Sequence, residues 1–226
     1  YAEKLRAAGV DEVFLQFDGL DDDANNVLRG RPLNKARLAT LENLRELGIA
    51  TSLIVVVAKG VNDKEVSRTL RFAMEPRNDH VREVFFLGLR MLGSARHAAN
   101  EGPGLSASML MPDEIVDLLT AQEPSIRRDD IENFNKLYFA MLSTFKVKKC
   151  LYVQHYMMVR DGDGSGRPIS DYLDLPALGL AADRYAEGFA DHPHFAKARL
   201  LASLARHGAN FKTLGRTALK SASSPP

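Results

Sequence analysis

The sequence is organised around one stretch, Val13-Phe-Leu-Gln-Phe-Asp-Gly-Leu-Asp-Asp-Asp-Ala-Asn-Asn-Val-Leu-Arg-Gly30. It opens with a short apolar run rich in β-forming residues, and the pair Asp18-Gly19 ends that run with typical turn chemistry. The aspartates that follow suit the positive end of a helix dipole, so the stretch predicts a strand, a loop and the start of a helix. Ligands of α/β proteins bind at the carboxyl ends of parallel strands. Gln16 and Asp18 are therefore candidates for a binding site, with an ordinary βα turn as the alternative explanation.

Helix and strand patterns alternate three times in this part of the chain. The near-continuous apolar run over residues 49–59 predicts a strand buried on both faces, and residues 84–89 predict the next strand. A repeat of about 35 residues is typical of βα units in a parallel sheet. We therefore predict an α/β fold in which residues 1–121 form half of a (β/α) barrel or an open sheet. The edge at Val13 is expected to be bare if the chain begins at residue 1.

The helix expected between the first two strands has an apolar stripe at helical spacing. Asn34 is the expected N-terminal cap and Gly48 the expected stop. The stripe consists of Ala36, Leu38, Leu41, Leu44 and Leu47.

The second half of the chain is predicted to be mainly helical. Helices are expected over residues 112–121, 129–145, 178–189 and 195–206, whereas residues 147–160 fit a strand or a helix equally. The tail rich in serine and proline is expected to be disordered. Residues 122–226 are therefore predicted to form a mainly helical C-terminal region.

Length and composition describe an ordinary globular protein. The chain has 226 residues, of which 45% are hydrophobic and 26% charged, and its formal net charge is +1. This balance gives no electrostatic reason to bind nucleic acid, and no apolar run is long enough to predict a membrane span. The single cysteine, Cys150, excludes an internal disulfide framework and favours a reducing, cytoplasmic setting.

Two short motifs suggest metal binding without supporting it. Asp161-x-Asp163-x-Ser165-Gly166 resembles the start of a calcium loop, but Tyr172 stands where the bidentate glutamate belongs. A flexible glycine-rich hinge is the better explanation. His192 and His194 flank a proline and have no third ligand near them in the sequence. We therefore assign no metal ligand.

Basic residues follow the second and third predicted strands. Lys59 and Arg90 could hold an anionic group such as a carboxylate. The alternative is that they pair with Asp18 and Asp63. A weaker hypothesis is an unrelated barrel enzyme that uses Lys59 as a Schiff-base amine.

Five sequence blocks resemble the later half of a radical S-adenosylmethionine (SAM) enzyme, in the branch that includes archaeal tetraether lipid synthases and related methylases. The blocks occur in the same order over about seventy residues, which makes their combination more specific than any one of them. The resemblance covers residues 1–96. The blocks are Leu15-Gln-Phe-Asp-Gly19, Arg29-Gly30, Leu41-Glu-Asn-Leu-Arg-Glu-Leu-Gly48, Val57-Ala-Lys-Gly-Val-Asn-Asp63 and Arg71-Phe-Ala73.

The resemblance implies a partial (β/α)6 barrel whose fourth to sixth strands are the three predicted here. It also implies a 4Fe-4S cluster that reduces SAM to a 5′-deoxyadenosyl radical, and an electron donor that reduces the cluster. By the same resemblance, Gln16 and Asp18 would meet the ribose of SAM and Arg29 its carboxylate. Lys59 and Arg90 would flank the adenosine, and no catalytic residue is assigned.

The sequence departs from the family in two places. The Cys-x-x-x-Cys-x-x-Cys motif that holds the cluster is absent and is expected upstream of residue 1. Leu87 and Leu92-Gly-Ser94 replace polar residues of the relatives, so the unidentified small-molecule or lipid-like substrate is expected to differ. The alternative function is a non-catalytic half-barrel that binds a partner or serves as a scaffold without the cluster.

Overall fold

The computed structural model describes residues 1–90, 108–147, 153–160 and 166–207. The chain divides into two compact units, Tyr1–Glu123 and Pro124–Pro225, which are described separately. The motif beginning at Asp161, Cys150 and the C-terminal tail lie outside the described residues. None of the described helices is both long and apolar enough to span a membrane.

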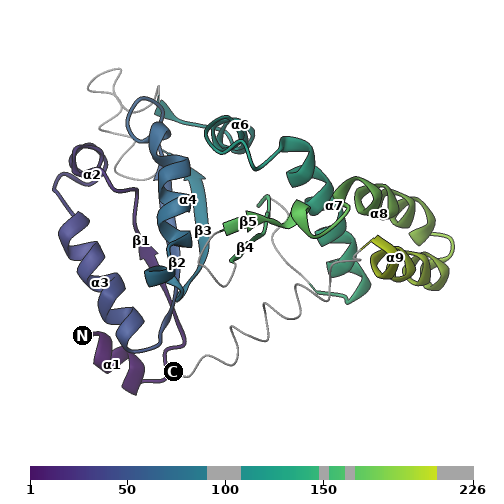
Figure 1. Ribbon diagram of the computed structural model, residues 1–226, viewed down its shortest axis with the longest axis horizontal. Coiled ribbons are helices and arrows are strands. Elements are labelled where there is room, and N and C mark those ends of the chain that lie inside the picture. The colour runs from purple at the N-terminus through teal and green to yellow at the C-terminus, as the bar shows by residue number, and fades with distance from the viewer. Residues whose placement is uncertain (91–107, 148–152, 161–165, 208–226) are drawn as a thin grey trace. The chain divides into compact units, whose positions relative to one another are not determined.

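The first unit is a parallel three-stranded sheet with helices between its strands (Figure 1). The strands are β1 (Glu12–Gln16), β2 (Ala50–Val57) and β3 (Val81–Gly88), in the spatial order β1-β2-β3. The helices are α1 (Ala2–Ala7), α2 (Asp22–Arg29), α3 (Asn34–Glu46), α4 (Val66–Met74) and α6 (Pro112–Gln122), with short 3-10 turns at Asp63–Glu65 and Pro76–Asn78. This arrangement confirms the predicted α/β class with part of a (β/α) barrel. The described strands do not close into a barrel.

The two faces of this sheet differ in what covers them. Leu53, Val55 and Val57 of β2 are buried in a core that also contains apolar residues of α3, α4 and α6. Side chains of alternate parity point to the opposite face. On this opposite face, which we call the inner face, Phe14 is 59% exposed and Leu87 is 44% exposed. The helices therefore cover one face of the sheet and leave apolar side chains accessible on the other.

Helix α3 is capped by a residue of the preceding helix. Asp22 Oδ1 accepts hydrogen bonds from the backbone N–H groups of Leu33 (2.9 Å) and Asn34 (3.0 Å). Asn34, the expected cap, makes no capping bond with its side chain. Its Oδ1 instead accepts a hydrogen bond from Asn25 Nδ2 at 2.9 Å. Asp22 therefore joins the start of α3 to α2, and the cap prediction was wrong.

The buried stripe of α3 also differs from the predicted one. The buried residues are Arg37, Leu41 and Leu44, which are spaced four and three apart on one face of a helix. Leu38, expected on the stripe, is 40% exposed, and Ala36 is also exposed. The prediction is confirmed at Leu41 and Leu44 and is wrong at the start of the helix, where an arginine that the stripe did not include is the buried residue.

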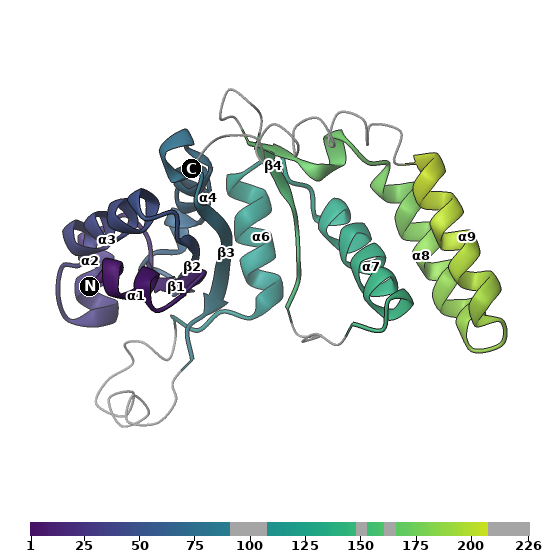
Figure 2. The same ribbon diagram turned by 90° about the horizontal axis from the view of Figure 1, so that it is seen from below.

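The second unit is mainly helical, as predicted. Its helices are α7 (Arg128–Thr144), α8 (Leu175–Phe189) and α9 (Pro193–His207), and α8 and α9 lie side by side in both views (Figures 1 and 2). A small antiparallel sheet is formed by β4 (Met158–Arg160) and β5 (Gly166–Pro168), followed by a 3-10 turn at Ile169–Asp171. The three helices pack around Leu137, Leu178, Tyr185 and Leu200.

Candidate functional site

The site begins where the backbone leaves β1. Phe17 continues the ladder, because its N–H donates to Ile54 O at 2.8 Å, and its buried ring stacks on Phe72 with centroids 5.3 Å apart. Asp18 and Gly19 then adopt φ angles of 58° and 110°. Aspartate tolerates the first of these conformations and glycine the second, so this pair of residues allows the sharp exit from the strand.

The carboxylate of Asp18 lies at the centre of a buried polar cluster. It is 0% exposed and accepts five hydrogen bonds. Oδ1 accepts from Gln16 Nε2 (2.5 Å), Arg29 Nη2 (3.1 Å) and Val56 N–H (2.9 Å). Oδ2 accepts from Arg29 Nε (2.6 Å) and Arg37 Nη2 (2.9 Å). A carboxylate buried at this depth is tolerated because two guanidinium groups pair with it.

The two arginines come from different helices and differ in exposure. Arg37, on α3, has a side chain only 7% exposed, and it also donates to Phe17 O and Asn25 Oδ1. Arg29, at the end of α2, has a side chain 32% exposed. It binds Asp18 through Nε and Nη2, and Nη1 makes no hydrogen bond to a described residue. Arg37 is thus buried with three acceptors inside the cluster, whereas Arg29 is partly exposed and keeps Nη1 outside its contacts with Asp18.

Gln16 is held in one orientation by its amide nitrogen. Nε2 donates to Asp18 Oδ1 at 2.5 Å and to Ile54 O at 3.1 Å, which uses both of its hydrogens. A reversed amide would place its oxygen against two acceptors, so the orientation is fixed. Oε1 accepts no hydrogen bond from the described residues and can accept one from a hydroxyl group.

The electrostatics of the cluster favour ionised Asp18. Burial by itself raises the pKa of Asp18, but hydrogen bonds from Arg29 and from Val56 N–H and the charges of both arginines outweigh it, so the pKa is lowered. Burial lowers the pKa of Arg37, and the carboxylate of Asp18 opposes that shift. A guanidinium group stays protonated at neutral pH, so the cluster contains one carboxylate between two cations.

Asn62 connects this cluster to the end of β2. Its Nδ2 donates to Asp18 O (2.9 Å) and Val56 O (2.8 Å), and its Oδ1 accepts from Ala58 N–H at 2.8 Å. The residue is 2% exposed. These bonds satisfy backbone groups at the ends of two neighbouring strands and fix one loop against the other.

Lys59 and Arg90 lie apart from this cluster. Lys59 is exposed, and its backbone N–H donates to Ser108 O at 2.9 Å. Arg90 Nη1 donates to Leu89 O (2.9 Å) and Leu110 O (2.7 Å). Neither side chain forms an ion pair with Asp18 or Asp63, and the exposed amine of Lys59 gives no support to a Schiff-base role, which needs a desolvated lysine. The structure therefore brings together Gln16, Asp18 and Arg29 and leaves these two basic residues outside.

Sequence reasoning missed Arg37, Asn25 and Asn62. Arg37 precedes Leu41 by four residues, and that spacing placed it on the buried stripe of α3. A buried arginine on an apolar stripe needs a carboxylate partner, and the nearby candidate at a strand end was Asp18. Asn25 and Asn62 gave no comparable signal, because asparagine is common in helix starts and turns.

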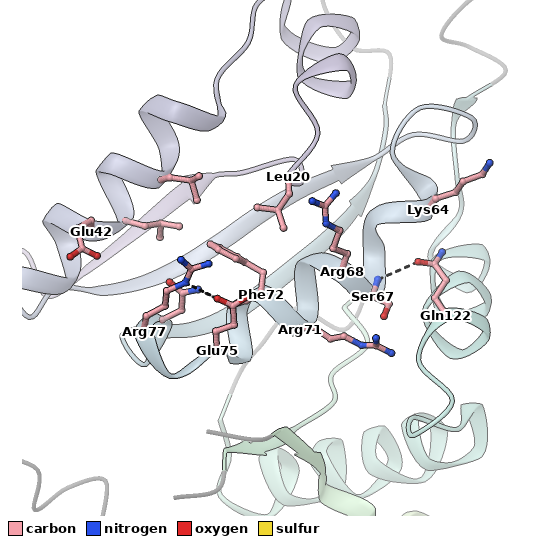
Figure 3. Close-up of a pocket in the computed structure, with 13 residues that line it drawn as sticks. Leu20, Glu42, Lys64, Ser67, Arg68, Arg71, Phe72, Glu75, Arg77 and Gln122 are labelled. Carbon is pink, nitrogen blue, oxygen red and sulfur yellow. Dashed lines mark hydrogen bonds and ion pairs between the residues drawn. The ribbon is translucent and has the colours of Figure 1, made fainter. Parts of the chain in front are cut away.

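Figure 3 shows a groove between α3 and α4, whose lining does not include Asp18 or the side chains that bind it. It encloses about 740 Å³ and is lined by Leu20, Leu38, Leu41, Glu42, Lys64, Ser67, Arg68, Arg71, Phe72, Glu75, Arg77, Asn78 and Gln122. Its arginines already pair with carboxylates of the chain, at 3.0 Å for Arg68 to Glu65, 2.8 Å for Arg71 to Glu123 and 2.6 Å for Arg77 to Glu75. We assign no ligand to the groove.

Metal ligands are not assembled in the part of the chain that the structure describes. No three side chains of histidine, cysteine, aspartate or glutamate lie close enough there to hold an ion. His192 and His194, at the junction of α8 and α9, therefore have no third ligand among these residues.

Comparison with known proteins assigns a family to the region that contains the polar cluster around Asp18. The family model described as the radical SAM superfamily matches residues 1–73. Residues 1–73 belong to the radical SAM superfamily. The match contains Gln16, Asp18, Arg29 and Lys59, and it ends before Arg90.

Curated relatives agree with this assignment. The chain is 34% identical over 94 residues to the 7,8-dihydro-6-hydroxymethylpterin dimethyltransferase of Methanocaldococcus jannaschii, covering 41% of this chain and 18% of that protein. It is 26% identical over 130 residues to the GTP 3′,8-cyclase of Campylobacter curvus, covering 58% of this chain and 36% of the relative. It is 35% identical over 74 residues to a probable GTP 3′,8-cyclase of Pyrococcus horikoshii, covering 33% of this chain and 24% of the relative.

These matches confirm the resemblance at the level of the superfamily. The branch of tetraether lipid synthases stays a prediction. The chain spans well under two thirds of each of these relatives, from 18% to 36% of their length.

Proposed function

We propose that this chain is part of a radical SAM enzyme and that the end of β1 holds SAM. The observation that carries the proposal is the convergence of Gln16 and Arg29 on Asp18, inside the region that matches the superfamily. Arg29 Nη1 would donate to the carboxylate of SAM, and Gln16 Oε1 would accept from a ribose hydroxyl. When bound, SAM and a 4Fe-4S cluster would supply radical chemistry for abstraction of a substrate hydrogen atom.

The residues of this site fit the polar groups of SAM. A guanidinium that is one third exposed and has an unused nitrogen suits a carboxylate, because charge-assisted hydrogen bonds are strong. An amide oxygen with no donor partner suits a hydroxyl. Neither group has to leave its present partners to make these contacts. The 4Fe-4S cluster needs three thiolates, and the sequence has one cysteine. We therefore propose that the cysteines that bind the 4Fe-4S cluster lie upstream of residue 1.

The substrate is proposed only as a class. Phe14 and Leu87 expose apolar surface on the inner face of the sheet, which supports a small-molecule or lipid-like substrate with an apolar portion. Reduction of the cluster requires an electron donor. No contact with nucleic acid is proposed, since the chain carries a net charge of only +1.

The test uses the full-length protein, reconstituted with iron and sulfide under anaerobic conditions. We expect a 4Fe-4S spectrum, SAM binding and 5′-deoxyadenosine on addition of a reductant. Arg29→Met should bind SAM about tenfold to a hundredfold more weakly, with an unchanged cluster spectrum. Exposed Arg31 provides the matched control, and Arg31→Met should behave as wild type. A full-length protein that holds no iron and binds no SAM would instead support the non-catalytic half-barrel.

A further inference from the structure

The carboxylate of Asp18 has no capacity left for a ligand. An ionised carboxylate offers about four lone-pair sites, and Asp18 already accepts five hydrogen bonds from protein groups. Its side chain is 0% exposed. A hydroxyl group of a bound molecule would have to displace one of these donors and reach a buried atom. The expected contact between Asp18 and the ribose is therefore not available in this structure.

Arg37 makes the position of Asp18 independent of Arg29. Its guanidinium donates to Phe17 O and Asn25 Oδ1 as well as to Asp18 Oδ2, and its side chain is only 7% exposed. Val56 N–H holds the other oxygen at 2.9 Å. The nearby carboxylate of Asp22 is bound to the N–H groups at the start of α3. Arg37 and Val56 N–H thus hold one oxygen each of Asp18, in addition to the bonds from Arg29.

Arg29 is oriented by this fixed carboxylate. Nε and Nη2 approach the two oxygens of Asp18 as a fork, at 2.6 Å and 3.1 Å, and this geometry sets the plane of the guanidinium group. Nη1, the nitrogen outside the fork, is left for another acceptor, and the side chain is one third exposed. Since Arg37 already neutralises Asp18, the charge of Arg29 remains available to an anion.

We infer that Asp18 is a positioning residue: anchored by Arg37, it aims Arg29 at the anionic end of the bound cofactor and orients the amide of Gln16, without touching the cofactor itself. This inference rests on the proposed function and deepens it. It assigns Arg37, which touches no ligand, a part in binding selectivity. The selectivity is for ligands that carry a carboxylate.

The test compares two ligands and three variants of the reconstituted full-length protein. SAM has a sulfonium and the amino-acid carboxylate, whereas 5′-methylthioadenosine keeps the adenosine and the 5′-sulfur, as a neutral thioether, and lacks the carboxylate. Asp18→Asn is the suitable change, because asparagine tolerates the positive φ of this position. It should weaken SAM binding about tenfold and weaken methylthioadenosine binding less than about threefold. Arg29→Met should show the same selectivity, and the double variant should bind SAM no more weakly than Arg29→Met.

Three results would overturn the inference. Asp18→Asn could weaken both ligands equally, the double variant could be additive, or Asp18→Asn could leave SAM binding unchanged. Failure of the proposed function looks different, because wild-type protein would then bind no SAM or Arg29→Met would bind it as tightly as wild type. If Asp18→Asn does not fold, a crystal structure of the wild-type protein with SAM decides. The inference requires an intact fork between Arg29 and Asp18 and no cofactor atom within about 3.5 Å of the Asp18 carboxylate, and a direct contact there would overturn it.

Discussion

The end of β1 and the ends of β2 and β3 carry similar polar residues and use them differently. At the end of β1, Asp18 is 0% exposed and joins two arginines, a glutamine and a backbone N–H group. At the ends of the other strands, Lys59 is exposed and Arg90 donates only to backbone carbonyls. A polar residue at a strand end becomes part of a site only when neighbouring elements bring it a partner.

The partners differ because the connections after the strands differ. The segment after β1 contains α2 and α3, and each of these helices sends one arginine to Asp18. After β2 the chain turns at once, and the side chain of Asn62 bonds Val56 O and Ala58 N–H, both at 2.8 Å, and Asp18 O at the end of β1 at 2.9 Å. That turn supplies no carboxylate to Lys59. The comparison predicts large effects of substitutions at the end of β1 and small effects at the other two ends.

The largest effect is expected for Arg37→Met. It leaves Asp18 buried with one cation and removes a donor from Phe17 O and Asn25 Oδ1. Breaking a buried pair costs about 3–5 kcal/mol, so the free energy of unfolding in denaturant should fall by that amount. Lys35→Met, an exposed change on the same helix, should stay within about 0.5 kcal/mol of wild type. A loss below about 1 kcal/mol for Arg37→Met would show that the polar cluster around Asp18 does not stabilise the fold.

Asp18→Asn should follow, with an effect that depends on pH. The folded pKa of Asp18 lies below its ordinary value of about 3.9, so between the two values the unfolded chain binds more protons and stability rises with pH. The stabilisation is complete above about pH 5 and is lost as the pH falls through the lowered pKa. Wild type should exceed Asp18→Asn by about 3 kcal/mol at neutral pH, and unfolding curves from about pH 7 to pH 3 should show this gap narrowing. A gap that widens in acid would contradict the assignment.

A smaller effect is expected for Arg90→Met at the end of β3. The change removes a hydrogen bond to the adjacent Leu89 O and one to Leu110 O, and the second joins the end of β3 to the segment before α6. Bonds of this kind to partly exposed groups are worth about 1 kcal/mol, which denaturant unfolding can resolve. If Arg90→Met lowered the free energy of unfolding as much as Arg37→Met, the ends of β1 and β3 would not differ in their contribution to stability.

The smallest effect is expected for Lys59→Ala at the end of β2. The side chain is exposed and forms no ion pair with a described residue. Its removal should change the free energy of unfolding by no more than about 0.5 kcal/mol. A clear destabilisation in the same denaturant measurement would reveal a role for Lys59 that its contacts do not show.

The sequence predicted the strands well, because their patterns are local. The apolar run over residues 49–59 corresponds to β2 at Ala50–Val57, and the turn at Asp18-Gly19 follows β1 as expected. The family resemblance gave the superfamily and the β/α arrangement. Leu41 and Leu44 of the predicted α3 stripe are buried, but leucine spacing did not reveal that Arg37, and not Ala36 or Leu38, is the buried residue one turn earlier. Burial of a charged residue depends on a partner far away in sequence, and no local pattern reports it.

Strand-end reasoning could predict only the part of the site whose residues lie close in sequence, and Arg29 was added by the family resemblance. Gln16 and Asp18 are two residues apart at one strand end, and they meet as neighbours. Lys59 and Arg90 come two residues after Val57 and Gly88. Val57 and Gly88 lie on the side of the sheet that the helices cover. The carbonyl of Leu110 lies 2.0 Å from where a Cβ on Gly88 would stand, so another chain segment occupies that side. Placing these basic residues required the path of the chain before α6, which the sequence does not show.

The most direct test of the account is a titration of SAM into the reconstituted full-length protein, comparing Arg29→Met with Lys59→Met. Binding at the end of β1 predicts that Arg29→Met weakens the affinity about tenfold or more and that Lys59→Met leaves it within about twofold of wild type. The opposite order, with Lys59→Met the weaker binder, would place the cofactor at the end of β2 and contradict the account.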